Sequence, residues 1–489
     1  MTIVLGAAVA LLVLALLVLV HRWLWIRLVR DTTAPGGAIR RTGTALAFAL
    51  PLLSVAALVA GRAGAPFWLE RTVAWPGYMW LAVLMYLSLA MLVAEPVRAV
   101  WLRRRSRVTP QASLGAQPHG APAAEPAPAQ GAPATGSGAE PRHAAAGAAT
   151  SGSGAEPRRA AEPHNPVQRE GAGRGTAPQA TLAATAEPAA LSGQHPAEPT
   201  EAIPAEATSA EPAPTTVSRR RFARIVAGTA AAAAAGTVGY GTYGVLRGPR
   251  VKRVQVPLAK LPRAAHGFRI AVVSDIHLGP ILGRAHTTRI VDTINRTQPD
   301  LIAIVGDLVD GSVQDLGPAA EPLRGLRSRH GSYFVTGNHE YFSGAQQWVD
   351  HVRELGLTPL ENARRELPYF DLAGVNDIAG ESEGHGPDFQ AALGDRDRAR
   401  SAVLLAHQPI VIDEAVRYGA DLQLSGHTHG GQLWPGEYVA ELANPTVAGL
   451  ERYGDTQLYV SRGAGAWGPP VRVGAPSDIT VVELASYQA

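Results

Sequence analysis

An apolar run that ends at an acidic residue is the feature that most constrains the fold of this chain. Residues 301–305 are all aliphatic, and Gly306 and Asp307 follow them directly. A short continuous aliphatic run is typical of a strand that is buried on both faces, and open α/β sheets bind ligands at the carboxyl ends of their strands. The run therefore predicts a buried strand that places the carboxylate of Asp307 at a ligand-binding edge.

The same pattern occurs five times between residues 270 and 431. The other four predicted strands cover residues 270–273, 333–336, 402–406 and 421–424. The side chains that follow these strands are those of Asp275, His277, Asn338, His339, His407, His427 and His429. A single such residue is usually a helix cap, a turn residue or an ordinary surface group, whereas five motifs in series at strand ends indicate one site.

The residue types predict a metal site that binds phosphate. Asp, Asn and His suit Mn, Fe, Zn or Mg, and the absence of cysteine excludes a thiolate site. Two cations roughly 3.5–4 Å apart need an anionic ligand between them, and together they can turn a bound water into a hydroxide that attacks phosphorus. Neutral imidazoles and an amide keep the ligand charge low, so the site stays cationic enough to attract a phosphate.

The order Asp-x-His, Gly-Asp-x-x-Asp, Gly-Asn-His-Glu, His, Gly-His-x-His resembles the calcineurin-like metallophosphoesterase superfamily over residues 268 to 485. The resemblance implies two divalent metal ions, with Mn favoured, and a four-layer α-β-β-α sandwich. It implies that one metal takes Asp275, His277, Asp307 and His429, and that the other takes Asp307, Asn338, His407 and His427. It also implies that His339 contacts the phosphoryl oxygen or protonates the leaving group, and that Asp310 orients His339.

Three apolar stretches near the N-terminus predict transmembrane helices at residues 2–20, 44–60 and 73–94, because about 20 apolar residues cross a bilayer. Five Arg follow the first span and five follow the third, but only two lie between the second and the third. The positive-inside rule therefore places the N-terminus outside, and the first loop and the end of the third span inside. Residues 1–107 form the predicted membrane module.

Residues 108–217 are rich in Ala, Pro, Glu and Gly and lack aromatic residues, which predicts a disordered linker. The segment 218–247 follows, with Arg219, Arg220 and Arg221 before an apolar run. It resembles a twin-arginine translocation signal, and a fourth transmembrane helix is the alternative. Four basic residues flank the run on each side, so the orientation rests on the first three spans. Either interpretation predicts an extracytoplasmic catalytic domain at residues 251–489.

Weaker candidates lie outside the strand-end motifs. The Gly-rich segment 463–470 predicts a loop near the metal site, where Trp467 touches a lipid or nucleoside or packs in a turn. Arg462 is a candidate phosphate contact, with a solvated surface role as the alternative. His286, His330 and His385 do not follow strands and are left out of the site. Helical spacing predicts helices at 287–295 and 346–355, and further strands are expected at 369–375 and 479–484.

These features predict a multi-pass cell-membrane protein whose dinuclear, metal-dependent phosphoesterase domain hydrolyses a phosphomonoester or a phosphodiester. Its expected partners are a phosphate-ester substrate that is lipid-linked or part of the cell envelope, membrane lipids, and the twin-arginine translocation machinery. Two alternatives remain: a nucleotidase or exported nuclease, and a non-catalytic membrane sensor that binds phosphate. Nucleic-acid binding is not expected, because the domain lacks a concentrated basic run beyond the membrane flank.

Overall fold

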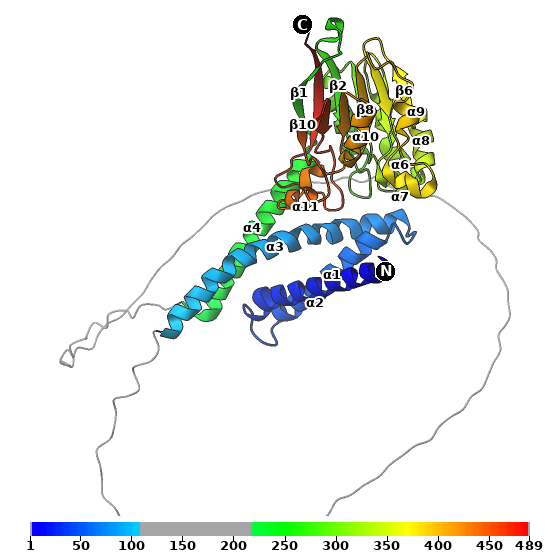
Figure 1. Cartoon of the computed structure of the whole chain (residues 1–489). Helices are drawn as coiled ribbons and strands as arrows, with labels where there is room; N and C mark the ends of the chain where they lie inside the picture. The colour runs from blue at the N-terminus through cyan, green and yellow to red at the C-terminus, as the bar shows by residue number, and fades with distance from the viewer. Residues whose placement is uncertain (1, 108–216, 488–489) are drawn as a thin grey trace, which may run out of the picture. The chain divides into compact units, whose positions relative to one another are not determined.

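The computed structural model describes residues 2–107 and 217–487, which belong to one compact unit (Figure 1). The predicted linker lies outside the described residues except for Val217. The helices of the C-terminal domain are α5 (Arg284–Arg296), α6 (Val313–Ala320), α7 (Asn338–Ser343), α8 (Ala345–Glu354), α9 (Phe389–Leu393), α10 (Ile412–Arg417) and α11 (Glu437–Ala440).

The C-terminal domain contains two six-stranded sheets. The first has the strand order β1-β12-β2-β3-β4-β5, and β2 to β5 are mutually parallel. Its strands are β1 (Arg250–Leu258), β12 (Asp478–Ser486), β2 (Phe268–Val273), β3 (Leu301–Val305), β4 (Ser332–Val335) and β5 (Thr358–Pro359).

The second sheet has the order β10-β11-β9-β8-β7-β6, in which β11, β9, β8 and β7 are mutually parallel and the two edge strands are antiparallel to their neighbours. Its strands are β10 (Gly449–Tyr453), β11 (Thr456–Val460), β9 (Leu422–Ser425), β8 (Ala402–Leu405), β7 (Asp371–Gly374) and β6 (Ala363–Glu366). All five predicted site strands are present within two residues of their expected bounds.

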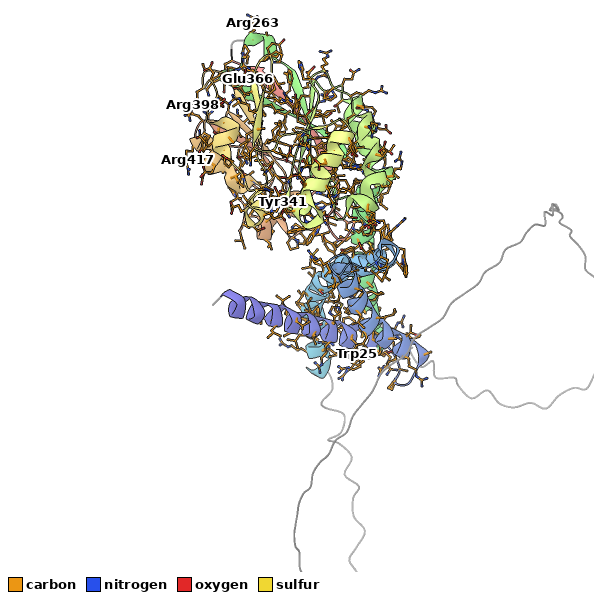
Figure 2. All side chains as sticks on the ribbon, turned by 90° about the vertical axis from the view of Figure 1, so that its right-hand side faces the viewer. Trp25, Arg263, Tyr341, Glu366, Arg398 and Arg417 are labelled. Atoms are coloured by element: carbon orange, nitrogen blue, oxygen red, sulfur yellow. The ribbon has the colours of Figure 1, made fainter. Side chains whose placement is uncertain are left out.

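Three apolar clusters define the layers of this domain. The first lies between the two sheets and includes Ile270, Val305 and Leu424. A second fills the space between the first sheet and helices α5, α6 and α8, and a third covers the second sheet with α9 and α10. The predicted four-layer α-β-β-α sandwich is therefore confirmed. Charged side chains such as those of Arg263, Glu366, Arg398 and Arg417 lie on its outer surface (Figure 2).

The two predicted helices owe their positions to apolar residues at helical spacing. In α5 the side chains of Ile290, Val291 and Ile294 are buried against the first sheet, and in α8 those of Trp348 and Val352 are buried in the same cluster. Both helices begin and end within three residues of the prediction. Because they cover the face of β2, β3 and β4, the carboxyl ends of these strands are left as the accessible edge.

The N-terminal part is helical. It consists of α1 (Thr2–Trp25), a π-helical turn η1 (Ile26–Arg30), α2 (Ala38–Val59) and α3 (Phe67–Arg107), and α4 (Arg219–Leu246) leads into β1. By length and composition, four helices among the described residues could cross a membrane. They overlap the four predicted apolar segments, but the first candidate span covers Leu11–Arg30 rather than residues 2–20.

Small residues let these helices approach closely, as in membrane helix pairs. A Cβ on Gly77 of α3 would lie 2.4 Å from the carbonyl oxygen of Leu53, so α2 and α3 pack backbone to backbone there. Ser54 Oγ donates a hydrogen bond of 2.8 Å to the carbonyl of Gly77. Helices α3 and α4 run antiparallel, because Trp101 stacks on Phe222 at one end while Met79 contacts Thr242 towards the other.

Candidate metal centre

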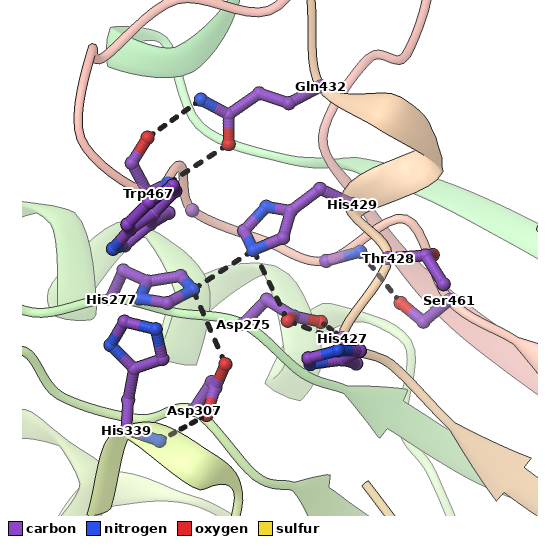
Figure 3. A network of polar contacts seen from close by, with 12 residues as sticks. Asp275, His277, Asp307, His339, His427, Thr428, His429, Gln432, Ser461 and Trp467 are labelled. Carbon is purple, nitrogen blue, oxygen red and sulfur yellow. Dashed lines mark hydrogen bonds and ion pairs between the residues drawn. The ribbon is translucent and has the colours of Figure 1, made fainter. Parts of the chain in front are cut away.

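Five strand ends meet at one edge of the sandwich. Strands β2, β3 and β4 are neighbours in the first sheet, and β8 and β9 are neighbours in the second. Parallel neighbours release their following loops at the same edge. The loops after these strands carry the candidate residues, and Figure 3 shows Asp275, His277, Asp307, His427 and His429 pointing toward one another.

One group of donor atoms comes from Asp275, His277 and His429, whose ligand atoms lie within 4.8 Å of one another. The Nε2 atoms of His277 and His429 are 3.0 Å apart, and His429 Nε2 is 3.4 Å from Asp275 Oδ1. Two ring nitrogens and a carboxylate that converge in a buried space need a proton or a cation between them. This group therefore has the donor chemistry of a divalent metal site.

A second group comes from Asp307, His407 and His427, also within 4.8 Å. Asp307 Oδ2 is 3.1 Å from His407 Nε2 and 3.8 Å from His277 Nε2, so this carboxylate faces both groups. The other oxygen of Asp307 accepts the backbone N–H of His339 at 2.9 Å. The position of Asp307 between the groups suits a bridging ligand.

Asn338 Oδ1 is buried at this second group and has no hydrogen-bond partner. His407 Nδ1 lies 2.9 Å from the carbonyl oxygen of Val305, which can only accept, so Nδ1 carries a proton and Nε2 is the nitrogen that faces the Asp307 carboxylate, 3.1 Å away. A buried, unpaired acceptor is costly unless it binds a ligand. The residues present therefore fit a cation held by Asp307, Asn338, His407 and His427.

Asp310 joins His277 to His339. Its Oδ1 lies 2.8 Å from His277 Nδ1 and 2.7 Å from His339 Nδ1, and the three residues form a third group of possible ligands. The His339 ring stands edge-on to His277, with ring centroids 4.7 Å apart. Because Asp310 accepts from Nδ1 of both rings, both have their Nε2 atoms free for other partners.

Five of these residues adopt a left-handed backbone conformation: Asp275, His277, Asp307, His427 and His429 have φ between 49° and 71°. Such a conformation costs roughly 1–3 kcal/mol per residue and persists where the surrounding structure enforces it. Gly306 precedes Asp307 with φ 73°, and a Cβ there would lie 2.5 Å from His407 Nδ1. The strained turns therefore carry five of the candidate ligands.

Glu340 supports the loop that carries Asp307, a role that the sequence pattern did not reveal. Its fully buried carboxylate accepts the backbone N–H groups of Gly337, Asp307 and Leu308 at 2.6, 3.0 and 2.8 Å. Burial, together with the neighbouring Asp307 carboxylate, raises the pKa of Glu340 to about 7. The Gly-Asn-His-Glu motif was the available signal, because its last residue is the acid that ties two loops together.

Arg472 is a second residue that sequence reasoning missed. Its side chain is buried, with 4% of the residue exposed. Its guanidinium lies 2.9 Å from His429 Nδ1 and donates a hydrogen bond of 3.0 Å to the His429 carbonyl. Burial and then the charge of Arg472 hold the pKa of His429 well below its usual value. Arg462, the phosphate contact suggested by the sequence, stays a prediction, and Arg472 is a further arginine that contacts the cluster.

The loop after β11 reaches the same edge, as the Gly-rich segment predicted. Trp467 lies with its ring centroid 6.0 Å from that of His339. The Trp467 backbone exchanges two hydrogen bonds with the amide of Gln432, at 2.8 and 3.0 Å, which hold the loop in place (Figure 3). His286, His330 and His385 belong to none of the three ligand groups found among the described residues.

Comparison with known proteins agrees with this geometry. The family described as calcineurin-like phosphoesterase matches residues 268–431, the span from β2 to the last histidine motif. An uncharacterized metallophosphoesterase of Aquifex aeolicus is 34% identical over 240 residues, which cover 48% of this chain and 91% of that protein. The chain belongs to the calcineurin-like metallophosphoesterase family.

Other metallophosphoesterases carry further segments. The transmembrane protein with metallophosphoesterase domain of Danio rerio is 39% identical over 259 residues, covering 50% of this chain and 59% of that protein. An uncharacterized metallophosphoesterase of Helicobacter pylori strain J99 is 37% identical over 247 residues, which cover 50% of this chain and 66% of that protein. The similarity thus spans less than two thirds of either relative.

The charges of the metallophosphoesterase site are strongly coupled. Burial alone would lower the pKa of His277, but the carboxylates of Asp310, Asp307 and Asp275 raise it to about 9. Burial would raise the pKa of Asp310, but His277 and His339 lower it to about 2. Burial and then His407 lower the pKa of His427 to about 4. Asp310 is therefore ionised at neutral pH, and His427 is neutral.

Proposed function

We propose that this chain is a membrane-anchored, dinuclear metal-dependent phosphoesterase that hydrolyses a phosphomonoester or phosphodiester. The observation that carries the proposal is the pair of buried donor groups with Asp307 between them. Carboxylate, amide and imidazole donors without a thiolate suit Mn, Fe, Zn or Mg, and Mn is the ion favoured by the family resemblance.

Asp275, His277, Asp307 and His429 would hold one ion, and Asp307, Asn338, His407 and His427 the other. When bound, the two ions would supply Lewis acidity and a hydroxide nucleophile at neutral pH. As metal ligands the imidazoles would be neutral, which would keep the net charge of the loaded site positive towards a phosphate. The complete donor set speaks against the alternative of a non-catalytic phosphate sensor.

His339 is the proposed general acid. It is partly exposed, with 15% of its side-chain surface accessible, whereas His277 beside it is fully covered. Asp310 holds His339 by Nδ1, so Nε2 is the nitrogen available to the oxygen of a leaving group. A general acid placed in this way delivers a proton as the phosphorus–oxygen ester bond breaks.

The four apolar helices are proposed to span the cell membrane, with the catalytic domain on the extracytoplasmic side. Ser218 Oγ caps α4 by accepting the Arg221 N–H at 3.2 Å, so α4 begins within the basic Arg219–Arg221 stretch. We assign α4 as the anchor of the domain and as a twin-arginine-like segment of bacterial type, with the translocation machinery as its partner. Membrane attachment supports a lipid-linked or envelope phosphate as substrate.

The test uses the full chain in nanodiscs with added Mn, with aryl phosphates and aryl phosphodiesters as substrates. Metal-dependent release of the aryl alcohol from at least one class is expected, and a nucleotide panel compares the nucleotidase alternative. His385→Ala serves as a control, because His385 is exposed and lies in none of the ligand groups. Metal-loaded protein that turns over none of these esters contradicts the proposal.

A further inference from the structure

Among the described residues, a cavity of about 460 Å³ opens over the site. The site residues His277, Asp310 and His339 line one wall. The opposite wall comes from α2, α3 and the turn between them, residues 60–66. The space in front of the metal centre is therefore enclosed partly by helices that are long and apolar enough to span a membrane.

Contacts with the C-terminal domain hold α3 in place. Phe67, the first residue of α3, packs against the apolar cluster that covers the first sheet. A Cβ on Gly468 would lie 3.7 Å from Tyr78 Cδ1, so the loop of Trp467 rests on α3. Further along α3, Tyr86 Oη donates a hydrogen bond of 3.0 Å to the carbonyl of Trp434. Helix α3 thus contacts the C-terminal domain at three separate points.

The lining is apolar where the helices contribute to it. Ala57 and Leu58 of α2 and Ala74 of α3 face the cavity from within the predicted spans. On the domain side, Phe342 and Trp467 are 68% and 49% exposed. Apolar surface of this kind beside a polar catalytic group suits the junction between a phosphate and a hydrocarbon chain.

The α2–α3 turn contributes Arg62 to the cavity wall. Its Nη1 donates a hydrogen bond of 3.0 Å to the carbonyl of Leu58. No carboxylate among the described residues pairs with its guanidinium. The other charged groups of the lining are the acids Glu70, Asp310 and Asp315, with His277 and His339. A guanidinium with free donors is suited to bind phosphate oxygens in a bidentate manner.

We infer that the substrate is the phosphate ester of a membrane lipid, that its hydrocarbon part lies against α2 and α3, and that Arg62 is a specificity-determining residue that binds its phosphate. This inference rests on the proposed hydrolytic function. In the reaction, the oxygen of water bonds to phosphorus, the ester P–O bond breaks, the lipid alkoxide takes a proton from His339, and the proton that water loses restores His339. The products are the lipid alcohol and a phosphate.

The experiment uses the full chain with Mn in nanodiscs that contain phosphatidic acid or phosphatidylglycerol, and products are measured by mass spectrometry. An aryl phosphate is assayed in parallel. Arg62→Ala is expected to raise KM for the lipid at least tenfold, to change kcat less than about threefold, and to affect KM for the aryl phosphate less. Arg62→Lys should recover part of the loss, because it keeps the charge but not the fork of donors.

Arg71→Ala is the matched control, because Arg71 lies on α3, is exposed, and does not line the cavity. It should leave both activities unchanged. Turnover of the aryl phosphate without turnover of either lipid would overturn the lipid inference and leave the hydrolase intact. Equal effects of Arg62→Ala and Arg71→Ala would overturn the role of Arg62. Turnover of no ester at all would instead overturn the proposed function.

Discussion

Each acidic residue of the site has a different set of partners, and these partners indicate its role. Asp307 touches both donor groups, Asp310 accepts from two imidazoles, and Glu340 accepts three backbone N–H groups. The same residue types on the surface would be solvated and weakly coupled. Substitutions at these positions should therefore separate metal binding, proton transfer and loop support.

Asp307→Ala and His339→Ala should have different effects. Loss of Asp307 removes the carboxylate shared by both donor groups, so metal content and turnover should both be lost. Loss of His339 removes only the proposed acid, so the metals should stay while kcat falls by about 10²–10⁴. Metal analysis of each purified variant, together with kcat on an aryl phosphate, checks this. Loss of both metals in His339→Ala would contradict the assignment.

His286 should make folding stability depend on pH. It is 1% exposed, neither ring nitrogen has a hydrogen-bond partner, and burial, then Arg289 and Arg472, lower its pKa from 6.5 to about 3. Below pH 6.5 the unfolded chain takes up the proton while the folded chain does not, so acid favours unfolding. Between pH 6.5 and pH 5 this one group should cost about 2 kcal/mol of stability.

The measurement is Tm of the full chain against pH. His286→Leu should lose this part of the pH dependence, since Leu does not titrate. The exposed His385→Leu should keep the dependence of the unmodified chain. An unchanged pH dependence in His286→Leu would show that His286 is not held neutral.

At the scale of elements, the contact between α4 and the segment 471–473 ties an apolar helix to the site. The backbone N–H of Arg472 donates a hydrogen bond of 3.3 Å to the carbonyl of Gly241, while the Arg472 side chain contacts His429. A Cβ on Gly241 would lie 2.6 Å from Val471 Cγ1 and 2.9 Å from the Arg472 carbonyl oxygen. The absence of a side chain at Gly241 is what lets the two backbones meet.

Gly241→Ala should therefore weaken this contact, whereas Gly239→Ala, two residues away on α4 with nothing within 4 Å, should not. Overpacking typically costs 1–3 kcal/mol, while Ala for Gly in an open helical position gains up to about 1 kcal/mol. Tm and kcat of the two variants are compared in nanodiscs. A Gly241→Ala protein as stable and active as Gly239→Ala would contradict the close packing.

For the whole molecule, the helix contacts and the distribution of basic residues both indicate which helix ends lie close to one another. Arg224 Nε donates 2.9 Å to the carbonyl of Thr32, so the start of α4 lies beside the turn after η1. The end of α3 is there too, because Arg27 pairs with Glu95 at 2.7 Å. The Arg residues that follow the first and third predicted spans are therefore remote from the α2–α3 turn, which lines the catalytic cavity and carries Arg62.

The proposed orientation can be tested with single cysteines, since the chain has none. Ala34→Cys in the basic turn and Asp455→Cys in the catalytic domain both replace exposed residues. By the positive-inside rule, a membrane-impermeant maleimide should label Cys at 455 in intact cells and Cys at 34 only after permeabilisation. The reverse labelling pattern would place the catalytic domain in the cytoplasm.

The sequence alone predicted the strands, the residues that follow them and the apolar helices, because these depend on local patterns. The aliphatic run Leu301–Val305 predicts a strand, and the position of Asp307 just after it predicts a ligand. Neither prediction depends on the rest of the structure. The roles of Glu340 and Arg472 could not be predicted, since they act on groups 32 and 43 residues away. The placement of Arg62 over the site required the tertiary structure for the same reason: its position depends on helix packing, which no local pattern encodes.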